Sequence, residues 1–231
     1  MRVVAIDGPA ASGKSSTARA VARVLGFHHL DSGALYRTLT RVALDAGLDP
    51  DDLDVAVLLA KADQRGLGLR PEGEDFVPLL DGAPAEHLIR TPEVTAAVSA
   101  VSAVPEVRDW ANARMRALAE AGVPIVVDGR DIGSVVFPEA GLKIFLYAKS
   151  VVRAMRRLAQ QGGKEPSNEE ILAEADRLKA RDAADRSRPV APLVSPEDAV
   201  ELDSGRMTFE EQVDGIARLA RAVYRLPDPG A

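Results

Sequence analysis

Residues 8–15 read GPAASGKS, and this stretch matches the pattern GxxxxGK(S/T) of a phosphate-binding loop. The loop follows the apolar run VVAID at residues 3–7 and precedes a helical pattern over residues 16–25, which is the context that the motif requires. Glycines let such a loop point backbone N–H groups at phosphate oxygens without obstruction. We therefore predict an ATP-binding site formed by Gly8, Pro9, Ala10, Ala11, Ser12, Gly13, Lys14, Ser15 and Ser16.

Two side chains of this loop have distinct expected tasks. Lys14 is expected to neutralise the β and γ phosphates, and Ser15 to offer its hydroxyl to Mg²⁺. The following helix directs its positive end at the same anion. The alternative, a chance glycine-rich turn after a strand, is disfavoured by the position of the loop.

The composition bounds the class of protein. A chain of 231 residues with 46% apolar content fits one domain with insertions better than two equal domains. The net charge of −6 disfavours a nucleic-acid or membrane-surface partner. The sequence has no cysteine, and its three histidines do not have the usual ligand spacings, so we expect no metal centre built from cysteine or histidine ligands. We interpret the histidines as structural or surface residues.

The pattern of apolar runs predicts an α/β fold. Short β-branched runs at residues 3–7, 125–128 and 143–147, with weaker ones at 27–30 and 200–202, alternate with helical patterns. This alternation indicates a three-layer core with a five-stranded parallel sheet between helices. Residues 66–88 contain turn residues typical of a small antiparallel insert. The segment QGGKEPSN at 161–168 separates helical patterns over 151–160 and 169–184, as a lid hinge does.

The segment LDSGALYR at residues 30–37 narrows the acceptor. A helix beginning here places Ser32 and Tyr36 on one face with Arg37 beside them. A hydroxyl, a phenol and a guanidinium together suit a phosphate monoester. An ordinary capped helix explains the same residues equally well.

Residues 31–37, DSGALYR, resemble the D(S/T)GAxYR segment of bacterial cytidylate kinases rather than the equivalent segments of adenylate or thymidylate kinases. The resemblance covers essentially the whole chain. Further matching blocks are IRT at 89–91 with Ser99 and Arg108 downstream, DGRDIGSVVFP at 128–138, and RDAADRSR at 181–188 followed by APL at 191–193.

This resemblance implies a P-loop nucleoside monophosphate kinase that moves the γ-phosphoryl group of ATP to CMP or dCMP with Mg²⁺. It implies a single kinase domain over 1–231, with a core of 1–31, 121–150 and 186–226. The acceptor-binding region with the insert would span 32–120, and the lid with its flanking helices 151–185. We also expect a cytoplasmic monomer, because we find neither a signal-peptide pattern nor a coiled-coil seam.

Asp128 ends an apolar strand, so its carboxylate is expected at the carboxyl edge of the sheet beside the phosphate loop. There it would orient Mg²⁺, which makes Asp128 and Ser15 the expected metal-side residues. Arg130 is expected to clamp the acceptor phosphate, and Asp131 to accept from the exocyclic amine of the base. The alternative for residues 128–131 is a polar turn tied by local charges.

Ser99 and Arg108 flank Pro105, which is typical of a helix start, so we expect them on consecutive helices that meet at a bend. The resemblance implies that both read cytosine, whose O2 and N3 accept hydrogen bonds while N4 donates. Uracil reverses this pattern at positions 3 and 4, which would cost about 1–3 kcal/mol for each unmet buried group. Without the resemblance, surface placement of Arg108 would be preferred.

The end of the predicted lid carries further charges. Residues 177, 181, 185 and 188 are predicted on one helical face, with Arg181 and Arg188 toward phosphates and Asp185 toward a sugar hydroxyl. A solvated charged face is the alternative. Asp182 and Arg186 are interpreted as a surface pair. In the helix before the hinge, Arg153 and Arg157 are expected to reach the transferring phosphoryl group, with an equal claim for Arg156.

These expectations define two residue sets. The catalytic set is Lys14, Arg130, Arg181, Arg188, Arg153 and Arg157. The acceptor set is Ser32, Tyr36, Arg37, Ser99, Arg108, Asp128, Arg130, Asp131, Arg181, Asp185 and Arg188. The rival functions are a P-loop kinase for UMP, AMP or shikimate, and a nucleotide-dependent switch or ATPase. A kinase for one of these other acceptors does not explain the set Ser99, Arg108, Asp131 and Asp185, which suits a pyrimidine nucleotide. A switch or ATPase would need an NKxD-like guanine reader or an ABC-type signature, and we find neither in the sequence.

Overall fold

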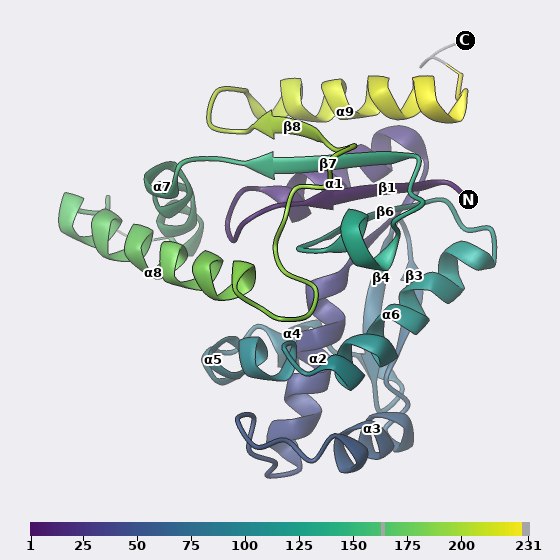
Figure 1. The fold of residues 1–231 in the computed structure, drawn as a ribbon, viewed down its shortest axis with the longest axis vertical. Coiled ribbons are helices and arrows are strands. Elements are labelled where there is room, and N and C mark those ends of the chain that lie inside the picture. Colours follow the sequence, from purple (N-terminus) through teal and green to yellow (C-terminus); the bar gives the residue numbers. More distant parts are fainter. Residues whose placement is uncertain (163–164, 228–231) are drawn as a thin grey trace.

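The computed structural model describes residues 1–162 and 165–227. Its centre is a parallel sheet (Figure 1) with the order β2-β6-β1-β7-β8. The five strands are β1 (Val3–Asp7), β2 (His28–Asp31), β6 (Ile125–Gly129), β7 (Leu142–Tyr147) and β8 (Val200–Asp203). The predicted five-stranded parallel sheet is confirmed, and each strand end lies within one residue of its predicted position.

Helices cover both faces of this sheet, which gives the predicted three layers. Within β1, Val3 and Ala5 pack into one apolar cluster, whereas Val4 and Ile6 pack into another on the opposite face. The first cluster lies against α2 (Ser32–Asp45) and α6 (Pro105–Glu120), and the second against α1 (Lys14–Leu25) and α9 (Phe209–Tyr224). The strands are apolar without alternation because both of their faces are buried.

The remaining helices belong to the two segments that flank the core. They are α3 (Val55–Gln64), α4 (Glu86–Ile89), α5 (Pro92–Val101), α7 (Ser150–Gln161) and α8 (Asn168–Arg186), with a π-helical turn η1 (Ile132–Val136) after β6. The bend expected at Pro105 is present, since α5 carries Ser99 and α6 carries Arg108. None of the described helices combines the length and the apolar character needed to cross a membrane.

The predicted antiparallel insert is present, but it continues the central sheet. Its strands are β3 (Gly68–Glu72), β4 (Asp75–Leu80) and β5 (Ala83–Pro84). β4 pairs with the edge strand β2 at His29 and Asp75, and the His29 N–H donates to the Glu74 carbonyl at 2.7 Å. The described sheet therefore has eight strands, because the edge of β2 finds a hydrogen-bonding partner in the insert.

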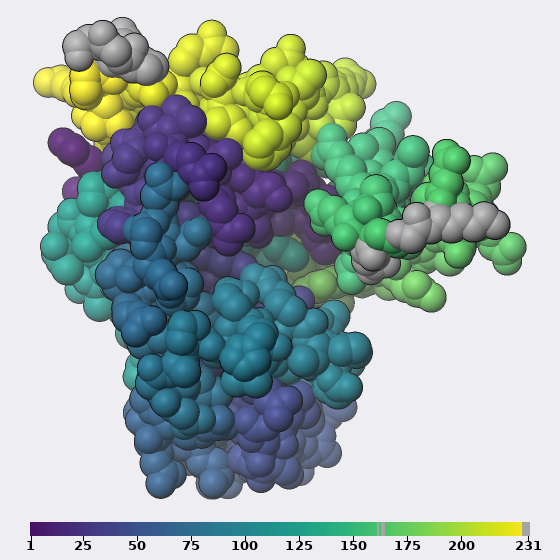
Figure 2. All heavy atoms as spheres, turned by 180° about the vertical axis from the view of Figure 1, so that it is seen from behind, coloured from purple at the N-terminus to yellow at the C-terminus, as the bar shows by residue number. Residues whose placement is uncertain are grey.

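Helices α7 and α8 pack against each other and project from the side of the molecule, as Figures 1 and 2 show. Their apolar cluster is small and separate from the two core clusters, and its buried members are Ala10, Ala154, Ala175 and Leu178. α8 extends two residues beyond its predicted end and stops before Arg188. Of the predicted hinge, residues 163 and 164 lie outside the described residues.

Candidate active site

The phosphate loop joins β1 to α1 in a conformation that depends on two glycines. Gly8 has φ 151°, and a Cβ at this position would lie only 2.1 Å from the Leu146 carbonyl oxygen on β7. Gly13 is left-handed, with φ 93°, at the start of α1. The Lys14 ammonium folds back over the loop and donates to the Pro9 carbonyl at 2.7 Å.

Lys14 is buried, and its hydrogen-bond partners in the loop are neutral. They are the Pro9 carbonyl and, at 3.5 Å, the Ser12 hydroxyl. Burial and the nearby charge of Arg130 hold the pKa of Lys14 well below its ordinary value, against the opposing charge of Asp128. The ammonium is therefore held at the loop by weak partners, and a phosphate oxygen would bind it more strongly.

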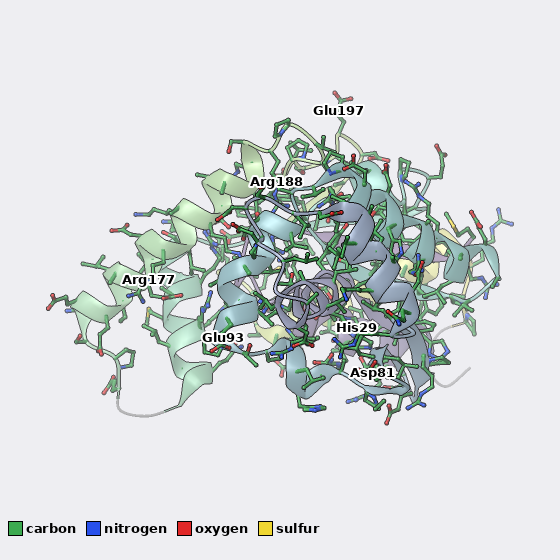
Figure 3. All side chains as sticks on the ribbon, turned by 90° about the horizontal axis from the view of Figure 1, so that it is seen from below. His29, Asp81, Glu93, Arg177, Arg188 and Glu197 are labelled. Carbon is green, nitrogen blue, oxygen red and sulfur yellow. The ribbon has the colours of Figure 1, made fainter. Side chains whose placement is uncertain are left out.

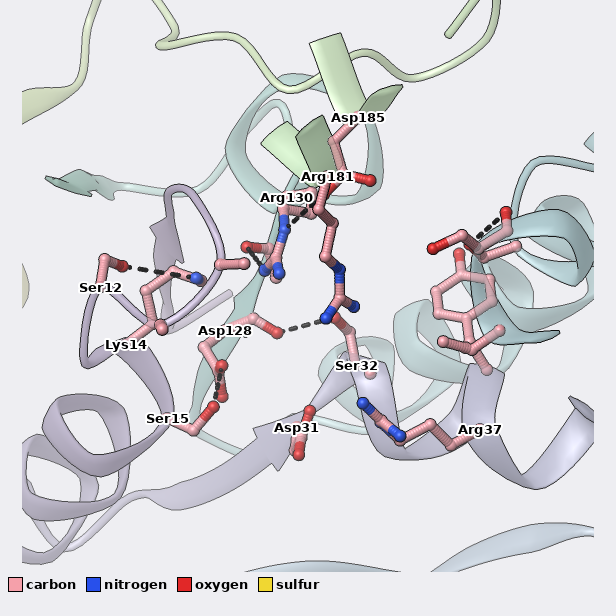
Figure 4. A pocket seen from close by; sticks show the side chains of 18 of the residues that line it. Ser12, Lys14, Ser15, Asp31, Ser32, Arg37, Asp128, Arg130, Arg181 and Asp185 are labelled. Carbon is pink, nitrogen blue, oxygen red and sulfur yellow. Dashed lines mark hydrogen bonds and ion pairs between the residues drawn. The ribbon is translucent and has the colours of Figure 1, made fainter. Parts of the chain in front are cut away.

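Ser15 and Asp128 meet beside the loop, as the sequence predicted. The Ser15 hydroxyl donates to Asp128 Oδ2 at 2.6 Å (Figure 4). Burial would raise the pKa of Asp128, but hydrogen bonds and charge from His29, together with Ser15 and Lys14, hold it below its ordinary value. An ionised carboxylate next to a hydroxyl supplies the hard oxygen ligands that Mg²⁺ prefers, so these residues fit that ion.

The α2 side chains predicted for the acceptor open into the same pocket as the loop. Ser32 donates to the Asp128 carbonyl at 2.7 Å, which ties the start of α2 to the end of β6. Arg37 donates to Thr95 Oγ1 at 3.0 Å, and Tyr36 lies under the Arg108 guanidinium, which is 5.2 Å from the ring centre. The predicted grouping of Ser32, Tyr36 and Arg37 is therefore present in space.

Arg108 and Asp131 form a buried ion pair deep in the acceptor half of the pocket, with side-chain exposures of 3% and 5%. Arg108 also donates to the Ser102 carbonyl at 2.9 Å. Its Nε is buried without a hydrogen-bond partner among the described residues. Because unpartnered buried donors are costly, this arrangement favours a polar ligand beside Arg108.

Arginines from separate elements converge between the two halves of the pocket (Figure 4). Arg130 donates to Asp185 at 3.0 Å, and Arg188 also pairs with Asp185. Arg181 has a buried Nε with no partner among the described residues, and burial together with the charge of Arg130 lowers its pKa to about 10. Arginines held this close repel one another, and bound phosphates would relieve the repulsion.

The pocket gathers nearly all of the predicted site. Its described charged lining comprises nine cations and four carboxylates, so it is locally positive in a chain of net charge −6. Those residues are Lys14, Arg37, Arg90, Arg108, Arg130, Arg156, Arg157, Arg181 and Arg188 with Asp31, Asp128, Asp131 and Asp185. Such an excess suits two phosphate-bearing ligands.

Three predicted residues lie outside the described pocket lining, namely Gly8, Pro9 and Arg153. Arg153 is buried behind the loop, where it pairs with Asp182 at 2.7 Å and donates to the Ala10 carbonyl at 2.7 Å. Arg156 and Arg157 from the same helix do line the pocket. In this conformation Arg153 supports the loop rather than facing the transferring phosphoryl group.

One expectation for α8 is wrong, and another holds only in part. Asp182 is buried rather than on the surface, because the loop lies over it and the Ala10 N–H donates to Asp182 Oδ1 at 3.0 Å. The predicted common face is present in part. Arg181, Asp185 and Arg188 all line the pocket, although Arg188 lies beyond the end of the helix. Arg177, one turn before Arg181, is exposed and pairs with Glu174 (Figure 3).

Sequence reasoning missed several polar residues at the site. Asp31 caps α2 and pairs with Arg90 at 2.9 Å on the pocket wall, and Ser102 lies within 3.5 Å of Arg188. His29 bonds the metal-side carboxylate of Asp128. Arg90 lies within a block that the resemblance singled out, but the only signal at His29 is its place inside a predicted strand.

Comparisons with known proteins agree with this geometry. The sequence model of the cytidylate kinase family matches residues 4–222. Cytidylate kinases from Mycobacterium avium and Limosilactobacillus reuteri are 43% and 41% identical to this chain, over 95% and 94% of both proteins. A solved shikimate kinase from Bacteroides thetaiotaomicron covers 97% of this chain and 99% of its own at 12% identity and a TM-score of 0.43, too weak a likeness to bear on function. The chain belongs to the cytidylate kinase family.

Proposed function

We propose that this protein transfers the γ-phosphoryl group of ATP to CMP or dCMP and so forms ADP with CDP or dCDP. The observation that carries the proposal is one pocket that runs from the phosphate loop to the buried pair of Arg108 and Asp131. A donor site and a base-reading site are thereby open to each other. Membership of the cytidylate kinase family supports the same substrates.

Phosphoryl transfer requires alignment and charge neutralisation more than covalent help from the protein. The loop N–H groups and Lys14 would hold the β and γ phosphates of ATP, while Arg37 and Arg130 would hold the acceptor phosphate. Arg181 lies between the two groups and would neutralise the phosphoryl group in transit. The acceptor oxygen attacks phosphorus as the bond to the β–γ bridging oxygen breaks, and ADP leaves with that oxygen.

The base would be read by polar groups that suit cytosine. Arg108 donates to the acceptor edge formed by O2 and N3, and Asp131 accepts from the N4 amine. Ser99 lies on the wall of the same half of the pocket. Uracil would set its O4 against the Asp131 carboxylate and its N3–H against the guanidinium, leaving both buried groups unpaired.

The proposal assigns roles to the segments around the core. Residues 32–120 form the acceptor-binding region, and residues 151–185 form the lid. Arg157 pairs with Glu174 at 3.2 Å at the edge of the pocket, and a short movement of α7 would bring it and Arg156 toward the phosphates. Lid closure would also exclude water from the transfer step. The small apolar cluster that holds α7 and α8 makes such a movement inexpensive.

Three further properties complete the proposal. Mg²⁺ is the ion that accompanies ATP, held by Ser15 and Asp128, and it would draw charge from the β and γ oxygens. The protein is cytoplasmic, because its phosphorylated substrates do not cross membranes unaided. It acts as a monomer, because all of the residues proposed for both substrates come from one chain.

An acceptor panel tests the proposal. We expect ADP formation from MgATP to be accelerated most by CMP and dCMP, and far less by UMP, dTMP or AMP, in a coupled assay at equal acceptor concentrations. Acceleration by another monophosphate alone would reassign the acceptor. Rapid ATP turnover that no monophosphate changes would contradict the kinase proposal and favour a nucleotide-dependent switch.

Replacing Arg108 with Met is expected to raise the KM for CMP about tenfold and to narrow the preference for CMP over UMP, because one buried donor to the cytosine edge is lost. The measurement is kcat/KM for both acceptors. Arg114→Met is the matched control, since Arg114 lies on the same helix but pairs with Asp63 and Trp110 outside the pocket. Unchanged discrimination in the Arg108 variant would exclude a base-reading role.

A further inference from the structure

His29 lies between two carboxylates in the interior of the molecule. Its Nε2 is 2.8 Å from Asp128 Oδ1, and its Nδ1 is 2.8 Å from Asp75 Oδ1. The side chain is only 2% exposed, so both ring nitrogens find their partners within the protein. The ring therefore connects the metal-side carboxylate with the first residue of the insert strand β4.

These contacts form a closed circuit that begins and ends on α1. At one end, Asp75 forms an ion pair with the exposed Arg19 at 2.8 Å. At the other end, Asp128 accepts a hydrogen bond from the Ser15 hydroxyl at 2.6 Å. Ser15 and Arg19 are four residues apart, so they lie on the same face of α1. The circuit Arg19–Asp75–His29–Asp128–Ser15 thus anchors Asp128 to the helix that follows the phosphate loop.

The two carboxylate oxygens of Asp128 have different partners. Its Oδ1 is engaged by His29, and its Oδ2 is directed at the Ser15 hydroxyl. Without the ring, Oδ1 would be buried and unpartnered, and the carboxylate would be free to rotate toward the Lys14 ammonium. Partners behind a metal-binding carboxylate commonly set its orientation, and their loss costs about 10–100-fold in metal affinity or activity.

We infer that His29, braced by Asp75, is a positioning residue that orients the Asp128 carboxylate toward the Mg²⁺ bound with ATP. The inference rests on the proposed function, since it assigns a task in the donor half of that site. His29 does not touch the nucleotide in this scheme. It acts through Asp128, and Asp75 acts through His29.

Two substitutions separate this role from a packing role. His29→Gln places its amide nitrogen near the position of Nε2 and retains the contact with Asp128. His29→Asn places its amide near the position of Nδ1 and retains only the contact with Asp75. Positioning of Asp128 requires that Gln preserve function better than Asn, whereas simple anchoring of the insert through Asp75 requires the reverse order.

The measurement is the affinity for ADP by calorimetry, once with Mg²⁺ and once with EDTA, for the wild type and both variants. We expect the gain in affinity that Mg²⁺ provides to fall about tenfold or more in His29→Asn and no more than about threefold in His29→Gln. The affinity for metal-free ADP should be similar in all three proteins. Equal losses in the two variants, or an undiminished gain in His29→Asn, would overturn the inference.

Asp75→Ala keeps the inference testable if the His29 variants fail to fold. Removal of the brace should lower the Mg²⁺-dependent gain about threefold, and a full gain in this variant would contradict the role of the circuit. Arg23→Gln is the matched control. Arg23 lies on α1 like Arg19, but it pairs with Glu74, the residue before Asp75, and so lies outside the circuit. This experiment uses no acceptor, so its outcome is independent of whether CMP is the substrate.

Discussion

Replacing Lys14 with Met is expected to lower kcat for CMP phosphorylation about 100- to 1,000-fold, the loss typical when one preorganised charge donor is removed. The ammonium is buried at the loop, and its partners in the apoprotein are a carbonyl and a hydroxyl. It is therefore available to the β and γ phosphates, where charge develops during transfer. Steady-state kinetics with saturating MgATP measures the effect.

The fold should survive this substitution. The pKa of Lys14 is lowered mainly by burial and by Arg130, which means that the protein bears a cost for keeping the ammonium charged. Removing that charge should leave the melting temperature of the apoprotein unchanged or raise it. Lys179→Met is the control, because Lys179 is exposed on α8, pairs with Asp176 and lies outside the described pocket lining. The kcat of this variant should match the wild type. A Lys14 variant with more than a tenth of wild-type kcat would contradict the assignment.

Replacing Arg181 with Gln is expected to lower kcat about 100-fold or more while stabilising the apoprotein by about 1 kcal/mol. Arg181 is held among Arg130, Arg37 and Arg157, and burial and this repulsion bring its pKa to about 10. We therefore expect Arg181 to bind a phosphate anion, which would relieve the repulsion among these arginines. Urea denaturation and single-turnover kinetics measure the two opposite changes.

Ligand binding provides the internal check on Arg181. A bisubstrate analogue that carries both nucleotides should raise the melting temperature of the wild type by more than that of Arg181→Gln, because only the wild type relieves repulsion on binding. If the variant lost stability in the apoprotein, Arg181 would be a structural residue rather than a phosphate ligand. We thus expect the arginine cluster to lower the stability of the apoprotein and to bind phosphates, and the two measurements test these effects separately.

The positions of Arg153 and Arg157 show the limit of predicting side-chain contacts from helical periodicity. They are four residues apart and were predicted to share a task, yet Arg153 is buried against Asp182 and the loop, while Arg157 lines the pocket. The difference arises because α7 packs against both the loop and α8, so its two turns meet different neighbours. Periodicity assigns a face, but the packing partner of each turn decides what that face contacts.

The sequence by itself determined the features that depend on local chemistry. The glycines and Lys14 of the loop, the five apolar strands and the Pro105 bend are specified by short-range geometry and by burial on both faces. The position of Asp128 beside Ser15 also followed from its place at the end of an apolar strand, because parallel strands end at the same edge of a sheet.

The tertiary structure decided what lies behind those residues. The pairing of β4 with β2, the burial of Asp182 and the placement of His29 between Asp75 and Asp128 join segments 46 to 172 residues apart. No local pattern distinguishes a buried bridging histidine from a surface one, because its partners are set by how the insert docks on the core. The loop at residues 8–15 thus identified a triphosphate site from sequence, whereas only the folded chain shows the contacts that hold its metal-side carboxylate in place.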